Sequence, residues 1–93
     1  MSNSAKLFES KEKMSRVEVA DLLRQLADRI AEGDVLLRQG REEVMVELPE
    51  TLKFELQATR KEKPGKSPER ELEIELKWVE GEELTNGGKL ELG

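Results

Sequence analysis

The sequence predicts an α+β fold in which one amphipathic helix packs on one face of a mostly antiparallel sheet, in the order β-α-β-β-β-β. Three observations predict it. Apolar residues recur at helical spacing over 15–32, they alternate with polar residues beyond residue 33, and the connections there are short. The helix stripe is the apolar surface that can cover the dry face of such a sheet. We therefore expect a single domain over 1–78 and a flexible tail over 79–93.

Composition excludes several kinds of site. The 93-residue chain has no cysteine and no histidine, so it offers no thiolate nucleophile and no imidazole base or ligand. We expect a protein that is not an enzyme and holds neither metal nor cofactor. A formal net charge of −5 disfavours nucleic acid as the main partner. Because no segment resembles a membrane helix or a secretory signal, we expect a cytoplasmic protein that does not bind membranes.

The helix has signals at both ends. Ser15 is a suitable N-cap, and Glu18, three residues later, completes a capping box. Gly33 is expected to end the helix in the left-handed conformation. Between these signals runs one apolar stripe, formed by Val19, Leu22, Leu23, Leu26, Ala27 and Ile30.

Five strands are expected, over 6–10, 35–39, 44–48, 52–60 and 70–78. The first rests only on the apolar pair Leu7 and Phe8 and is predicted to be an edge strand. The last two alternate strictly, and their dry face holds Leu52, Phe54, Leu56, Ala58, Leu72, Ile74, Leu76 and Trp78. Residues 40–43 are predicted as a turn.

The end of the chain offers two further patterns. The glycines from Gly81 to Gly88, followed by Lys89, loosely resemble a phosphate-binding loop, but the spacing is wrong and Leu90 stands where Ser or Thr is needed. We interpret this stretch as a flexible turn. Leu90 and Leu92 leave open a short edge strand within the tail.

A charged loop over 60–70 is the one basic patch. It carries two glutamates against Arg60, Lys61, Lys63, Lys66 and Arg70. It contains no aromatic residue for base stacking, so a solubilising hairpin loop is the simpler interpretation. The alternative is a contact site for a nucleic-acid backbone or an acidic protein.

The last strand carries an acidic row on its polar face. Glu71, Glu73 and Glu75 alternate with apolar residues, so their side chains share one side of the strand. Such a row can contact a basic partner or a divalent cation, although a solvated face near Lys53 and Lys77 is the simpler interpretation. Trp78 is expected to be a structural anchor at the strand's apolar end rather than a ligand platform.

Three segments resemble the amphi-Trp domain family. They are Leu7–Ser10 with the helix from Met14 to Asp28, the segment Glu43–Pro49, and the amphipathic strand Arg70–Trp78 that closes on tryptophan. The resemblance covers about 6–78. It implies a small stand-alone prokaryotic domain without an assigned biochemical function, and it carries over no catalytic or ligand residue.

Two kinds of function therefore remain. The first is a non-enzymatic protein-interaction module, which uses a sheet edge or the outer sheet face to bind a protein partner or a second copy of the chain. The second is binding of nucleic acid or an acidic partner through the loop 60–70. An enzyme or metal site built from carboxylates and lysines has the least support.

Overall fold

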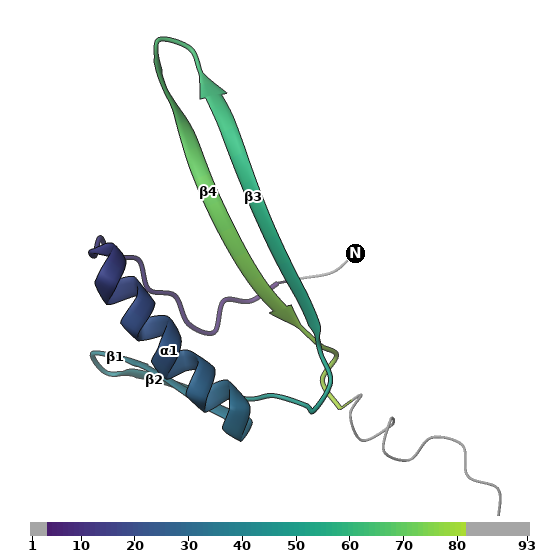
Figure 1. The fold of residues 1–93 in the computed structure, drawn as a ribbon. Coiled ribbons are helices and arrows are strands. Elements are labelled where there is room, and N and C mark those ends of the chain that lie inside the picture. The colour runs from purple at the N-terminus through teal and green to yellow at the C-terminus, as the bar shows by residue number, and fades with distance from the viewer. Residues whose placement is uncertain (1–3, 82–93) are drawn as a thin grey trace, which may run out of the picture. The chain divides into compact units, whose positions relative to one another are not determined.

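The computed structural model describes residues 4–81, and the chain divides into two compact units, Met1–Leu48 and Pro49–Gly93 (Figure 1). The elements are α1 (Arg16–Glu32), β1 (Asp34–Gln39), β2 (Glu42–Glu47), β3 (Lys53–Lys63) and β4 (Lys66–Lys77). The α+β class is confirmed. The single sheet is wrong, because β1 pairs with β2 and β3 with β4 in two separate antiparallel sheets. The single domain over 1–78 stays a prediction, and the tail from residue 82 lies outside the described residues.

Both predicted ends of α1 are confirmed. The Ser15 hydroxyl accepts a hydrogen bond from the Glu18 N–H, and the Ser15 N–H donates to the Glu18 carboxylate, each at 3.0 Å. The second bond lowers the pKa of Glu18 below its usual 4.5, and the hydroxyl contact acts in the same direction. At the other end Gly33 has φ of 97° and its N–H donates to the carbonyls of Arg29 and Ile30. The helix is therefore held by local bonds that its own sequence supplies.

In the first unit, α1 packs on β1 of the β1–β2 hairpin. Val35 is 6% exposed and is the one buried residue among residues 4–81. Gly40 and Arg41 form the two-residue turn of this hairpin, so β2 begins at Glu42, earlier than expected. Gly40 has φ of 60° while Arg41 does not enter positive φ, which is the pattern of a type II′ turn.

The second unit is the long hairpin of β3 and β4. Phe54 lies opposite Leu76, Leu56 opposite Ile74, and Ala58 opposite Leu72. Opposite residues share a face, so the predicted grouping of apolar residues is confirmed as a row of cross-strand pairs. The prediction that this face is dry is wrong, because Phe54 and Leu72 are 60% and 69% exposed. On the other face, the carboxylates of β4 alternate with these apolar residues as expected.

The charged loop predicted over 60–70 is wrong. β3 continues to Lys63 and β4 begins at Lys66, so that only Pro64 and Gly65 form the turn. Proline followed by a glycine at φ of 71° fits a type II turn. The backbone twist of a type II turn does not match the twist of the two strands that it joins. A register shift between Lys61 and Lys63 lies next to the turn. Sequence alternation missed these strand ends because both faces are polar beyond Ala58.

Pro68 lies inside β4, near this register shift. A proline has no N–H for a strand ladder, and within sheets it occurs at edges or bulges. Its position agrees with a strand that has one neighbour, β3.

The edge strand predicted over 6–10 is also wrong. Residues 4–15 form neither helix nor strand, and the chain bends at Leu7. The Lys6 Nζ atom lies 2.9 Å from the Glu9 Oε2 atom. In a strand, residues three apart point to opposite faces and lie about 10 Å apart, so this ion pair favours a curved segment. Two apolar residues are not enough to hold a strand that has no neighbouring strand among residues 4–81.

Candidate functional site

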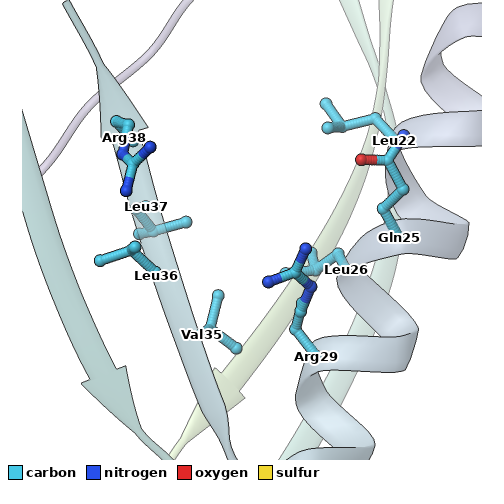
Figure 2. Close-up of a pocket in the computed structure, with 8 residues that line it drawn as sticks. All are labelled: Leu22, Gln25, Leu26, Arg29, Val35, Leu36, Leu37 and Arg38. Atoms are coloured by element: carbon cyan, nitrogen blue, oxygen red, sulfur yellow. The ribbon is translucent and has the colours of Figure 1, made fainter.

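A groove runs between α1 and β1 in the first unit. Figure 2 shows Val35 and Leu26 pointing toward each other across it. The cavity measures about 310 Å³ and is lined by Leu22, Gln25, Leu26, Arg29, Val35, Leu36, Leu37 and Arg38. Successive residues of β1 point to opposite faces of the sheet, yet both sets line the cavity. The groove therefore follows the edge of β1 and not only one of its faces.

The backbone along this edge is unpaired by any described strand, since β2 is the sole neighbour of β1 within residues 4–81. The Leu48 N–H donates to the Gly33 carbonyl at 2.8 Å. Hydrogen-bonded pairs of an antiparallel ladder recur at every second residue. Val35 and Leu37 therefore bond to β2, while the N–H and C=O groups of Leu36 and Arg38 point outward. The edge presents these outward groups directly beside the apolar groove.

Two arginines lie at the rim of the groove, and one of them leaves the rim with a net positive charge. Arg29 comes from the last turn of α1 and forms no ion pair with a described residue, whereas the Arg38 Nε atom lies 3.0 Å from the Glu43 Oε2 atom. Gln25 adds an uncharged polar group. An apolar floor with a cationic rim suits a partner that alternates apolar and acidic side chains.

The sequence prediction missed this groove. Gln25 and Arg29 lie on the polar side of the helical pattern and Arg38 belongs to no apolar stripe, so nothing in the sequence marks them as lining a groove. One signal could have found them: Gly33 alone connects α1 to β1. Such a short connection turns the strand back along the helix and brings Arg29 close to the start of β1.

The predicted basic residues lie on the distal half of the β3–β4 hairpin, but they do not form one cluster. Arg60 lies opposite Arg70 on the apolar face, and Lys61 lies opposite Glu69 on the polar face. Ion pairs join Arg60 to Glu62 at 2.9 Å and Lys63 to Glu69 at 3.4 Å. Lys61, Lys66 and Arg70 form no ion pair with a described residue. The positive charge is therefore divided between two faces and partly neutralised.

The acidic row of β4 lies on the polar face as predicted. Glu75 is opposite Glu55, Glu73 is opposite Gln57, and Glu71 accepts a 3.5 Å hydrogen bond from the Thr59 hydroxyl. Within residues 4–81, no three carboxylates gather closely enough to hold a metal ion. The row is a surface of spaced charges and not a chelating cluster.

Lysines surround the proximal end of this row. The Lys53 and Lys77 Nζ atoms lie 3.1 Å and 3.8 Å from the Glu55 Oε1 atom, and Lys77 also lies 3.8 Å from Glu75. The hydrogen bond from Lys53, followed by the charge of Lys77, lowers the pKa of Glu55 below 4.5. This supports the solvated-face interpretation at that end, while Glu71 and Glu73 have no lysine partner among the described residues.

Within the described part of the second unit, taken by itself, no element covers the apolar face of the hairpin. Phe54 and Leu56 are each 60% exposed, Leu72 is 69% exposed and Ile74 is 50% exposed. Trp78 directly follows β4 and is half-buried. An exposed apolar patch of this length is unusual on a soluble protein and marks a contact surface. Sequence alternation found the face but assigned it to the core.

No helix within residues 4–81 is both long and apolar enough to cross a membrane. Comparison with known proteins adds a family. The family model described as the Amphi-Trp domain matches residues 1–93. No curated protein and no solved structure matches the chain.

Proposed function

The chain belongs to the Amphi-Trp domain family, and from its surfaces we propose that it is a non-enzymatic protein-interaction module. The observation that carries this proposal is the outward edge of β1 beside the groove of about 310 Å³. The cytoplasmic location expected from the sequence is part of the proposal.

The mode of binding is addition of an extended segment to β1. Main-chain bonds to the outward N–H and C=O groups of Leu36 and Arg38 supply affinity, and side chains that enter the groove supply selectivity. Because Arg29 and Arg38 border the groove, the preferred segment alternates apolar residues with aspartate or glutamate. A segment with lysines at those positions meets like charge and binds more weakly.

Amide shifts of the labelled full chain test this role. Two synthetic peptide pools serve as probes, one alternating apolar residues with glutamate and one with lysine. We expect the glutamate pool to shift the Leu36 and Arg38 amides, and the lysine pool to shift them less. The proposal fails if neither amide responds, or if both pools act equally.

A matched pair of variants isolates the main-chain contribution. Leu36→Pro and Leu36→Ala both remove the leucine side chain, but only the proline also removes the outward N–H. Leu36→Pro is expected to weaken binding of the glutamate pool well beyond Leu36→Ala. Equal weakening means that the groove binds side chains without strand addition.

The hairpin tip supports a second candidate, which is binding to a nucleic-acid backbone. Three cations there, Lys61, Lys66 and Arg70, have no described ion-pair partner. If all three contact phosphates of a single strand, the logarithm of affinity falls with a slope of about −2 against the logarithm of salt concentration. A labelled oligonucleotide titrated at several salt concentrations tests this candidate, and binding without that salt dependence contradicts it.

A further inference from the structure

We infer that the apolar face of the β3–β4 hairpin binds the same face of a second copy of this chain. This inference uses a different surface from the edge of β1, so the two stand or fall separately. The face ends at Arg60 and Arg70 near the tip of the hairpin. Continuing the strand alternation one residue past the last pair, Lys53 and Lys77, places Leu52 and Trp78 at its base. Between these two ends lie only apolar residues, namely Phe54, Leu56, Ala58, Leu72, Ile74 and Leu76.

The exposed side chains require a cover. A two-stranded hairpin is marginal in water, and it becomes stable when its apolar face packs against another layer. In β3 and β4 the four residues Phe54, Leu56, Leu72 and Ile74 are each at least half exposed. Two such faces pack about 10 Å apart, as the sheets of a β-sandwich do. Each then removes the other's apolar side chains from water.

Repulsion between arginines determines the relative direction of the two copies. Arg60 lies opposite Arg70, so an arrangement with both tips together places four arginines side by side. A two-fold axis between the two faces, parallel to them and crossing the strands at the level of the Leu56–Ile74 pair, places the tips at opposite ends instead. The like charges then lie far apart, and the interface is formed by one patch used twice, as in most dimers.

The same axis brings each tip over the other copy's tryptophan. Arg60 is four residues from Leu56 in one direction, and Trp78 is four residues from Ile74 in the other. Both distances are about 14 Å along a strand, so rotation superposes the arginine pair on the partner's Trp78. A guanidinium over an indole face is a favourable cation–π contact. The face is therefore complementary to itself in both shape and charge.

The area sets the strength of association. Nine residues of two paired strands cover about 30 Å by 10 Å on each copy. That area lies below the range of stable protein interfaces, so we expect a weak, reversible dimer that forms only at high protein concentration.

Sedimentation equilibrium of the full chain tests the inference. The mass is expected to rise with concentration from 10.6 kDa toward twice that value. Leu56→Lys places a charge at the centre of the apolar face and should hold the chain at the monomer mass. Gln57→Lys adds the same charge to the polar face one residue away and should dimerise normally. A strict monomer up to about 1 mM, or equal behaviour of the two variants, overturns the inference.

The tip contact has its own readout. The combined change Arg60→Ala and Arg70→Ala should raise the dissociation constant about tenfold, while Lys61→Ala on the polar face should not. Trp78 is the only tryptophan, so its emission should shift with dilution at the midpoint of dissociation. This arrangement is wrong if Lys61→Ala weakens association as much as the arginine changes do. It is also wrong if the emission of Trp78 does not change with protein concentration.

Discussion

Arg60 and Arg70 lie directly opposite each other across the β3–β4 hairpin, on the face that carries Leu56 and Ile74. Like charges at directly opposed positions destabilise an antiparallel pair. Arg60 has a local partner, since its Nη1 atom lies 2.9 Å from Glu62 Oε2, whereas Arg70 has no ion pair within residues 4–81. The Arg60–Arg70 pair is thus an unfavourable contact in the polar half of the hairpin, and its cost can be measured.

Arg70→Glu is expected to stabilise the hairpin. The new carboxylate faces Arg60 and leaves the Arg60–Glu62 pair in place, so the free energy of unfolding should rise by about 0.2–1 kcal/mol. Urea unfolding at the lowest workable protein concentration measures this without self-association. Arg70→Gln, which removes the charge alone, should give part of the gain, and a loss of stability in both variants would contradict the prediction.

Ser15→Ala should destabilise α1. The change removes the hydroxyl that accepts from the Glu18 N–H, and loss of an N-cap of this type costs about 1 kcal/mol. Thermal unfolding followed by circular dichroism at 222 nm measures it. Ser10→Ala is the matched control, because Ser10 precedes the helix in an irregular segment; a similar loss there would show that the effect is not capping.

The capping box should make α1 sensitive to acid. Because the pKa of Glu18 is lowered on folding from 4.5, its contribution is fully present above pH 4.5 and is lost as pH falls through the folded value. Melting temperatures recorded from neutral pH downward should therefore decline in this window. Glu18→Gln keeps an acceptor but does not titrate, so it should flatten the decline; an unchanged profile would exclude Glu18 as its source.

Gly33→Ala should also destabilise the first unit. Its φ of 97° is in the left-handed region, which costs a residue with a Cβ atom about 1–2 kcal/mol. An added Cβ would meet the Leu48 carbonyl oxygen at 4.0 Å, an ordinary contact, so the cost comes from the backbone. Gly33→Asn should lose less, because asparagine tolerates this region better. Urea unfolding in which alanine costs nothing would contradict this account.

Glu55→Gln should reduce the stability of the hairpin base in a salt-dependent way. It removes the carboxylate between Lys53 and Lys77 and leaves two lysines directly opposite each other. The difference from the natural chain should shrink at about 1 M salt, where charges are screened within about 3 Å. Glu73→Gln removes a carboxylate on the same face that has no lysine partner among residues 4–81, so it should not reproduce the loss.

Features that depend only on neighbouring residues could be predicted from the sequence. Ser15, Glu18 and Gly33 define the ends of α1 within one residue of the prediction, because capping involves only neighbours in the chain. Alternation likewise placed Leu56 and Ile74 on one face. Alternation indicates which side of a strand a residue faces but not which strands pair. For that reason the sequence predicted one sheet where the structure has two.

The remaining features depend on distance in space or on competing local forces. The groove combines residues of α1 and β1 whose proximity follows from the path of the backbone after Gly33, and its arginines look like ordinary surface residues in the sequence. The strand ends at Lys63 and Lys66 were hidden because alternation loses its meaning where both faces are polar. Leu7 and Phe8 alone are too short an apolar pattern to fix a strand, and no described strand pairs with their segment.

Pro68 has a consequence for how copies of this chain aggregate. A strand of eleven or twelve residues with an open side is a template on which further chains can polymerise without limit. A proline interrupts that template, since it offers no donor to an incoming strand. We therefore expect concentrated solutions to stop at small closed assemblies, and Pro68→Thr, which restores the donor in a strand-favouring residue, to promote fibril growth detectable by thioflavin fluorescence.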